Sequence, residues 1–299
     1  MISVKNASKK FGTKTILDSV SFEVGDGSVF GLVGCNGAGK TTLLKSMAGV
    51  YRLDSGEVLM NGKDSFICPE VRQKLFYAPD DIWFEPFTTI EKSAGFYAGY
   101  YPGFSFDTLY KLCDILNLDR KEKLNSFSKG MQRQTEVIFG LACNPGVLLL
   151  DESFDGLDPA KRNLMNSMVV DYVAEKNSSV VISSHNLHEI ADICDRVAIL
   201  DGNRIIMNRS VDDISADRCK FRLVFTDEKT KADFASFDIK SFNSDGKIIM
   251  LSLKGDADEN EARLKAMNPV IIEKFPLTLE EIFLEETEEK DYDFKEIFS

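Results

Sequence analysis

The stretch GCNGAGKTT, residues 34–42, has the most specific chemical pattern in the chain. It fits the spacing G-x-x-x-x-G-K-[ST], whose fixed positions are taken by Gly34, Gly39, Lys40 and Thr41. Glycines let successive backbone N–H groups surround a phosphate, and a helix that begins at the end of the loop adds its dipole. The lysine can reach the β- and γ-phosphates, and the threonine hydroxyl is suited to ligate Mg²⁺. The alternative, a glycine-rich turn that happens to contain a lysine, is disfavoured by the strand predicted before it and the helix predicted after it.

We predict that the loop binds a nucleotide through Gly34, Asn36, Gly37, Ala38, Gly39, Lys40, Thr41 and Thr42. Cys35 lies inside the same loop. Its thiol is either a group whose alkylation blocks nucleotide binding or an inert small side chain. The loop alone does not distinguish kinases, GTPases, motor ATPases and transport ATPases, so other motifs must decide among them.

Two carboxylates and a histidine follow apolar runs elsewhere in the chain. VLLLDES places Asp151 and Glu152 at the end of a predicted buried strand, and VVISSH places His185 just past another. Because ligands of open α/β sheets bind outside the carboxyl ends of the strands, all three side chains are expected near the phosphate loop. Asp151 is suited to hold Mg²⁺, Glu152 to polarise an attacking water, and His185 to contact the γ-phosphate. The alternatives are an acidic strand exit and a surface or capping histidine.

The elements that must position these residues follow from apolar runs and turn signals. Several of the runs are continuous rather than alternating, which is typical of strands covered on both faces. Strands are predicted at residues 19–24, 28–33, 57–61, 147–151, 179–183 and 196–200. A helical pattern occupies residues 85–145, with Thr88 and Glu91 as a candidate capping box. Asp158 and Pro159 are suited to begin a further helix.

The amino-acid pattern changes after the first two thirds of the chain. We predict one domain over residues 1–214, with the helical region 85–145 inserted in it, and a small α+β domain with an acidic tail over residues 215–299. Within the first domain, apolar spacing predicts a helix over 187–194. That helix includes His188, to which we assign no role.

Composition and charge limit the possible partners and location. The 299 residues include 36 basic and 48 acidic side chains, a net charge of −12, which disfavours sequence-independent nucleic-acid binding. Apolar runs fall far short of the roughly 18 residues that a membrane span needs. The N-terminal residues do not resemble a signal peptide. We therefore expect a cytoplasmic protein whose scattered cysteines are reduced.

Taken in order, these motifs resemble those of the ATP-binding subunits of ABC transporters. The resemblance covers residues 1–214 and rests on GCNGAGKTT, FSKGM, VLLLDE, GLD and SSH. FSKGM, residues 127–131, is similar to the ABC signature LSGGQ, with departures at Phe127, Lys129 and Met131. The resemblance is most specific to bacterial subunits whose membrane domain is a separate polypeptide, and PLTLEEIFLEE near the C-terminus is similar to the tails of that group. It implies an α/β P-loop NTPase fold of the ABC type.

The resemblance also implies how the sites are shared. In this family two subunits face head to tail, and each ATP lies between the phosphate loop of one and the signature of the other. Ser128 and Gly130 would then act on the partner's ATP, and Asp158 would cross the interface. Phe11 matches the aromatic residue that stacks on adenine, although a core phenylalanine is an alternative. The helical insertion would contact the membrane subunit.

The metal site implied by the resemblance consists of Thr41, Asp80 and Asp151. Asp80, in YAPDD, occupies a position where the family usually has glutamine. A carboxylate is a good ligand for Mg²⁺ but adds negative charge near the γ-phosphate. The alternative is that Asp80 caps a turn.

The function implied is that of an ATP-hydrolysing subunit that binds ATP and Mg²⁺ and powers a membrane permease. Its partners would be that permease and a second ATPase subunit, identical or not, at the inner face of the membrane. One rival is an ABC ATPase of DNA repair or translation, which the single set of motifs and the acidic charge disfavour. The other is a nucleotide sensor that hydrolyses slowly, which Glu152 disfavours.

Overall fold

A computed structural model describes residues 1–186, 192–216, 218–275, 277 and 281. They form two compact units, Met1–Asn208 and the residues from Arg209 onward, so the division lies before the predicted boundary at residue 214. Most of the predicted helix at 187–194, with His188, lies outside the described residues, as do most of PLTLEEIFLEE and the acidic tail.

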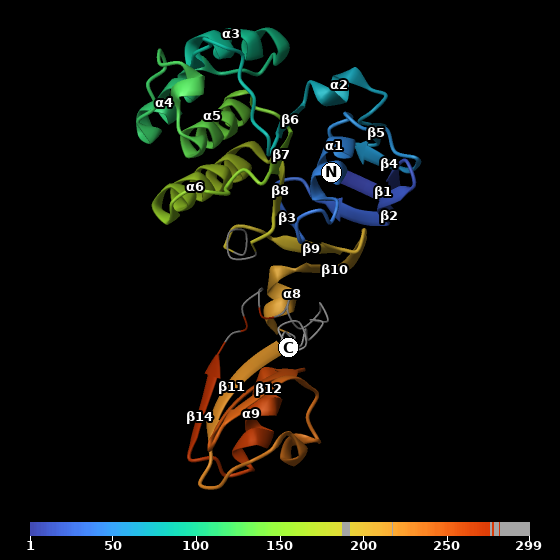
Figure 1. Cartoon of the computed structure of the whole chain (residues 1–299), viewed down its shortest axis with the longest axis vertical. Coiled ribbons are helices and arrows are strands. Elements are labelled where there is room, and N and C mark those ends of the chain that lie inside the picture. Colours follow the sequence, from blue (N-terminus) through green and yellow to red (C-terminus); the bar gives the residue numbers. More distant parts are fainter. Residues whose placement is uncertain (187–191, 217, 276, 278–280, 282–299) are drawn as a thin grey trace, which may run out of the picture. The chain divides into compact units, whose positions relative to one another are not determined.

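The first unit contains a six-stranded sheet in the order β10-β9-β3-β8-β7-β6. From β9 to β6, neighbouring strands are parallel. The central strands β3, β7 and β8 are buried along nearly their whole length, as their continuous apolar runs predict. Parallel strands end at a common edge (Figure 1), and the phosphate loop, Asp151 and His185 lie at the ends of β3, β7 and β8. The strands are β3 (Val29–Val33), β6 (Leu75–Ala78), β7 (Val147–Asp151), β8 (Ser179–Ser184), β9 (Arg196–Asp201) and β10 (Arg204–Ser210).

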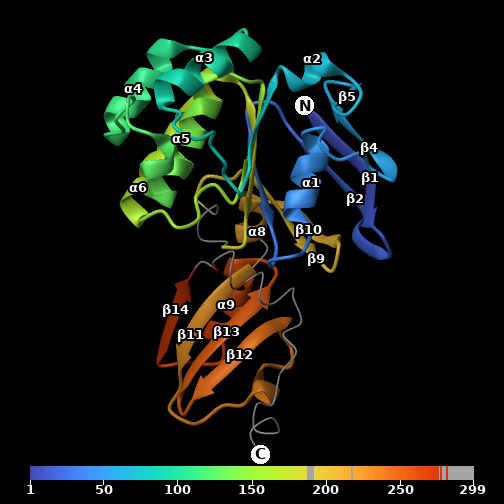
Figure 2. The same cartoon turned by 45° about the horizontal axis from the view of Figure 1, so that its top comes forward.

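A second, antiparallel sheet in the order β2-β1-β4-β5 belongs to the same unit. Helix α1 (Lys40–Met47) lies between the two sheets (Figure 2), because Leu43, Leu44 and Met47 are fully buried in a core that both sheets share. This packing holds the start of α1, and with it the phosphate loop, against both sheets. The strands are β1 (Ile2–Phe11), β2 (Lys14–Val24), β4 (Ser55–Met60) and β5 (Lys63–Asp64), and the short helix α2 (Pro69–Arg72) follows them.

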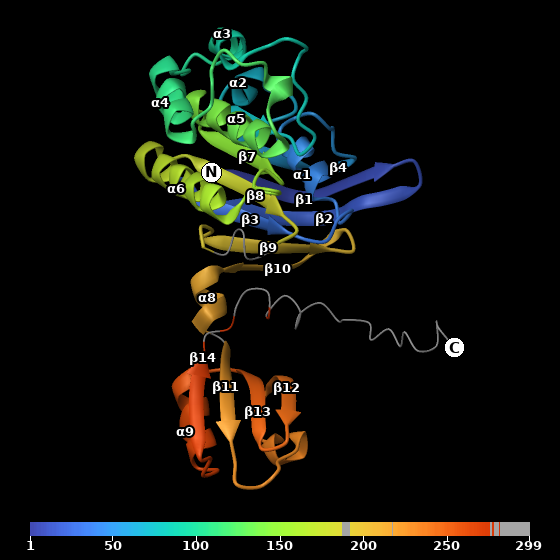
Figure 3. The same ribbon diagram turned by 60° about the vertical axis from the view of Figure 1, so that its left-hand side comes forward.

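The helical part of this unit confirms the predicted insertion into an α/β fold (Figure 3). Each of its longer helices begins at a hydroxyl or carboxylate that accepts a backbone hydrogen bond. The cap of α3 is Thr89, so the prediction of Thr88 was wrong by one residue. A Cβ at Gly140 would lie 2.8 Å from Leu148, so glycine lets α5 approach the sheet closely. The helices are α3 (Ile90–Tyr100), α4 (Phe106–Leu116), the 3₁₀ turn Leu124–Ser126, α5 (Lys129–Ala142) and α6 (Pro159–Lys176).

The second unit has a core of its own. It consists of an antiparallel sheet in the order β12-β13-β11-β14, whose Phe221 and Leu251 are buried in one cluster with Leu264 of helix α9. Its elements are α8 (Val211–Ala216), β11 (Arg218–Val224), a 3₁₀ turn (Lys231–Phe234), β12 (Ile239–Asp245), β13 (Ile248–Lys254), α9 (Ala257–Lys265) and β14 (Ile271–Phe275). No helix among the described residues of either unit is both long and apolar enough to cross a membrane.

Candidate active site

The phosphate loop joins β3 to α1 at the carboxyl edge of the six-stranded sheet. Two of its glycines are required by geometry. A Cβ at Gly34 would lie 2.3 Å from the carbonyl oxygen of Leu200, so another residue would push the loop away from β9. Gly39 has φ 111°, a backbone conformation that side chains rarely adopt, and it immediately precedes α1.

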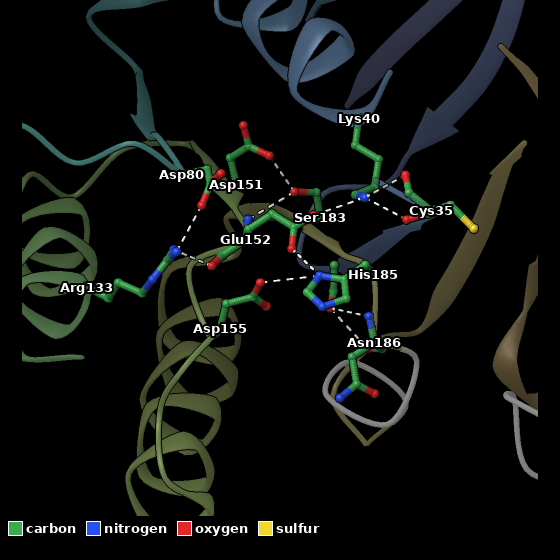
Figure 4. Close-up of polar contacts among 12 residues, drawn as sticks. Cys35, Lys40, Asp80, Arg133, Asp151, Glu152, Asp155, Ser183, His185 and Asn186 are labelled. Atoms are coloured by element: carbon green, nitrogen blue, oxygen red, sulfur yellow. Dashed lines mark hydrogen bonds and ion pairs between the residues drawn. The ribbon is translucent and has the colours of Figure 1, made fainter. Parts of the chain in front are cut away.

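Lys40 lies over the loop with its side chain buried. Its Nζ donates hydrogen bonds to the carbonyl oxygens of Gly34 at 2.6 Å and of Cys35 at 3.3 Å. It also forms an ion pair with Oε1 of Glu152 at 3.0 Å (Figure 4). The structure thus brings together the predicted phosphate-binding ammonium and the predicted water-activating carboxylate.

Asp151 ends β7 and is fully buried, and each of its carboxylate oxygens accepts a hydrogen bond. Ser183 Oγ donates to Oδ1 at 2.6 Å, and the Tyr77 hydroxyl donates to Oδ2 at 3.0 Å. Burial, helped by the charge of Asp151, raises the pKa of Tyr77 well above 10, so the phenol remains a donor. Tyr77 and Ser183 were not predicted as site residues. The only available signal was that each lies close in sequence to a motif residue.

Glu152 has φ 52°, a left-handed conformation that is unusual for a residue with a side chain. Its N–H donates to the carbonyl and the hydroxyl oxygen of Ser183, and its carbonyl accepts a hydrogen bond from Arg133. Burial alone raises the pKa of this carboxyl. Side-chain hydrogen bonds with Asp155, His185 and Lys40, together with the charge of Lys40, outweigh burial and lower the pKa to about 2.

His185 follows β8 and its ring faces both acidic groups. Its Nδ1 lies 2.7 Å from Oε2 of Glu152 and 3.3 Å from Oδ2 of Asp155. The hydrogen bond to Glu152 raises the pKa of the imidazole above 6.5; burial opposes this, and the charges of Asp155 and Glu152 add to it. The histidine is therefore a hydrogen-bonded partner of the glutamate rather than an isolated surface side chain.

Beside these groups is an open pocket of about 500 Å³. Most of the predicted residues line it, together with Lys14, Ile16 and Asp155, which sequence reasoning missed. The predicted residues in its wall are Asn36, Gly37, Gly39, Lys40, Thr41, Thr42, Asp80, Glu152 and His185. The pocket therefore unites the phosphate loop with the ends of β6, β7 and β8.

Oxygen groups suited to a magnesium ion lie at the same place. Thr41 and Asp80 line the pocket, and the end of β7 brings Asp151 to the same edge of the sheet. Hydroxyl and carboxylate oxygens are the ligands that Mg²⁺ prefers, so these residues fit the ion. Asp80 Oδ1 also accepts a hydrogen bond from Arg133 at 2.9 Å. Glu152, Asp155 and His185 form a second group whose ligand atoms lie within 4.8 Å of one another.

Seven predicted residues do not line the pocket. Three of them, Gly34, Ala38 and Asp151, belong to the phosphate loop and to the end of β7. The other four lie elsewhere in the first unit. Phe11 ends β1 with 47% of its surface exposed and contacts the ring of Tyr51 edge-on, so it is not a core phenylalanine. Ser128 caps α5 by accepting from the N–H of Met131, with Gly130 in the first turn. Asp158 caps α6 by accepting from Lys161, as predicted. The roles of Phe11, Ser128, Gly130 and Asp158 toward nucleotide stay predictions.

Comparison with known proteins gives consistent similarities. A family model described as ABC transporter matches residues 17–155. The chain is 28% identical to the ABC transporter ATP-binding protein YtrB of Bacillus subtilis, over 95% of this chain and 97% of that one. It is 34% identical to an uncharacterized ABC transporter ATP-binding protein of Methanocaldococcus jannaschii, over 71% of this chain and 79% of the relative.

Solved structures agree on the fold. An ATP-binding subunit of an ABC transporter superposes with a TM-score of 0.66 at 27% identity, covering 72% of this chain and 91% of that one. A dimeric bacterial ABC transporter cassette superposes with a TM-score of 0.64 at 20% identity, covering 71% of this chain and 99% of that chain. The covered share corresponds in size to the first unit.

Proposed function

Since the chain belongs to the ABC transporter family as an ATP-binding, ATP-hydrolysing subunit that powers a transporter, we propose which of its residues carry out the reaction and with which partners. The observation that carries the proposal is the contact of the buried Lys40 and Glu152 with each other and of Glu152 with His185 in one pocket. An ammonium, a carboxylate and an imidazole in this arrangement can bind a γ-phosphate and direct a water at it.

The proposed mechanism follows from the side chains present. The loop N–H groups and Lys40 bind the phosphates of ATP, and His185 contacts the γ-phosphate. Glu152 is ionised at neutral pH because its pKa is lowered to about 2, so it can accept a hydrogen bond from the attacking water and orient it. Thr41 and Asp151 would hold Mg²⁺, which would neutralise part of the phosphate charge, while Asp80 is ion-paired with Arg133. The backbone hydrogen bonds of Glu152 fix its carboxylate relative to the pocket.

We further propose that two such subunits pair around the nucleotides. Ser128 supplies a hydroxyl at the start of α5, a helix of 14 residues whose N-terminal dipole attracts anions. Together with Gly130 it would complete the phosphate site of the opposite subunit, while Asp158 would lie at the interface. A dimeric cassette among the related folds supports this arrangement. Phe11, exposed at the end of β1, would stack on adenine.

The proposed membrane partner is a separate permease that binds an aromatic surface next to α3. Trp83, Phe87 and Phe96 are 76%, 69% and 74% exposed, and with Tyr97 they line a hollow of about 510 Å³. Exposed aromatic side chains around a hollow are typical of sites that receive another protein segment. The subunit would thereby be held at the cytoplasmic face of the membrane.

The test of this function is the substitution Glu152→Gln, which keeps the size of the side chain and removes its charge. ATP hydrolysis should fall at least about 100-fold while ATP binding is retained, since general-base catalysis contributes roughly that factor. In ATP and Mg²⁺ this variant should elute as a dimer from a sizing column. Lys40→Ala is the matched control, which should lose ATP binding itself. Unchanged hydrolysis by Glu152→Gln would remove this residue from the reaction.

A further inference from the structure

Arg133 bridges two residues of the active site from outside the pocket. It lies on α5, and its guanidinium donates to Oδ1 of Asp80 at 2.9 Å and to the backbone carbonyl of Glu152 (Figure 4). The arginine side chain is only 17% exposed, whereas Asp80 is about half exposed toward the pocket. One planar group with several donors therefore contacts both the end of β6 and the end of β7.

The first consequence concerns the backbone of Glu152. Its left-handed conformation is held from both sides, because Ser183 accepts from its N–H while Arg133 donates to its carbonyl. A strained residue keeps its conformation only when its surroundings fix it. Without Arg133 the peptide that follows Glu152 loses the side-chain hydrogen bond that fixes its carbonyl.

The second consequence concerns charge. Asp80 lines the pocket together with Glu152 and Asp155, so an uncompensated third carboxylate would repel a nucleotide phosphate. Arg133 brings the opposite charge to within hydrogen-bonding distance of Asp80. The aspartate can then occupy this position without adding net negative charge to the pocket.

We propose that Arg133 is a positioning residue with two separable effects: it fixes Glu152 for hydrolysis, and it neutralises Asp80 so that the γ-phosphate can bind. The proposal rests on the role given above to Glu152. In this proposal the carboxylate of Asp80 is the ion-pair partner of Arg133. It is not a required Mg²⁺ ligand, which differs from the expectation based on the sequence.

The experiment is a double-mutant cycle of Arg133→Ala and Asp80→Asn in the full chain. It measures kcat, KM for ATP and the Kd of both ATP and ADP, with Arg133→Lys as the conservative variant. Arg133→Ala should weaken ATP binding roughly tenfold by exposing the phosphate to Asp80, and should lower kcat roughly tenfold by losing a charge-assisted hydrogen bond. ADP, which has no γ-phosphate, should bind within about twofold of the unaltered protein.

The double variant separates the two effects. Adding Asp80→Asn to Arg133→Ala should restore ATP affinity but leave kcat low, since the carbonyl of Glu152 still lacks its donor. Asp80→Asn alone should leave the Mg²⁺ concentration that gives half-maximal hydrolysis unchanged, because Arg133 and not the metal holds Asp80. Arg133→Lys should keep ATP affinity and recover only part of kcat, because an ammonium lacks the planar fork of donors.

Several results would overturn the proposal. Equal losses of ATP and ADP affinity with a lowered Tm would show a purely structural role for Arg133. If Asp80→Asn needs more Mg²⁺ for hydrolysis, Asp80 is a ligand of the metal rather than only a partner of Arg133. A double variant no better than Arg133→Ala in ATP binding would exclude neutralisation. If Glu152→Gln hydrolyses ATP normally, the proposed function fails instead, and that result is independent of Arg133.

Discussion

His185 and Glu152 share a hydrogen bond that changes the acidity of both side chains in opposite directions. The pKa of Glu152 is lowered from 4.5 to about 2, so its contribution to stability is present above 4.5 and is lost as the pH falls toward 2. The pKa of His185 is raised above 6.5, so its contribution is complete below 6.5 and is lost as the pH rises through the raised value. The pair is therefore most stabilising between these limits.

This sharing gives a direct prediction for His185. In nuclear magnetic resonance titration its imidazole should have a pKa above 6.5, and Glu152→Gln should lower that pKa because the charged acceptor is gone. The chain has only two histidines, so the signals can be assigned with the variant His188→Gln. An unaltered His185 titration in Glu152→Gln would mean that the hydrogen bond does not set its acidity.

Residues that belong to a sequence motif were predicted. Residues that reach the site only through the folding of distant segments were not. The phosphate loop, Glu152 and His185 were predicted because their types follow strands at a common edge. Arg133 could not be found this way, because its partner Asp80 is far away in sequence and pairs with it only through packing of α5 on the sheet. A helical arginine after the signature has no distinguishing pattern of its own.

At the scale of elements, the buried central strands were predicted, whereas the short strand β6 and the exposed strand β12 were not. β3, β7 and β8 are continuous apolar runs and were found within a residue or two. β6 has only four residues, too few for a periodic pattern. β12 is mostly exposed and its polar sequence reads as a loop, since the strand forms by pairing with β13. Tertiary pairing, not local preference, determines such strands.

The aromatic surface formed by residues before and within α3 can be tested as the proposed docking site of the permease. Trp83→Ala together with Phe96→Ala should weaken binding to the permease while leaving ATP hydrolysis by the isolated subunit unchanged, because neither ring lines the nucleotide pocket. Co-purification of a tagged subunit from native membranes measures the first effect. The matched control is Ile115→Ala on α4, another exposed apolar side chain, which does not line the hollow. Equal recovery of the permease with all variants would place its docking site elsewhere.

The whole chain consists of two units with separate cores, and the described site residues all belong to the first. The sequence predicts a boundary at residue 214 from a change in amino-acid pattern. A boundary there leaves β10 whole, since that strand ends at Ser210 within the first sheet.

Ending the chain at Ser210 should therefore leave a folded protein that binds ATP with nearly unchanged affinity, while pairing of subunits or docking to the permease is weakened. Calorimetric titration with ATP and light scattering measure the two properties. A chain ended at Asp201, which lacks β10, is the comparison and should be less stable because the edge of β9 is exposed. Loss of ATP affinity in a folded Ser210 truncation would show that the second unit contributes to the site.

Helix α5 has a consequence that appears only when two molecules are considered. It begins at Ser128, which is proposed to contact the nucleotide of the opposite subunit, and about 7.5 Å further along its axis it carries Arg133, which holds Glu152 of its own subunit. A rigid helix of this length transmits a displacement of its first turn directly to the residue one turn later. Binding of ATP to one subunit would then influence hydrolysis in the other. The Hill coefficient for ATP would measure how strongly α5 couples the two sites.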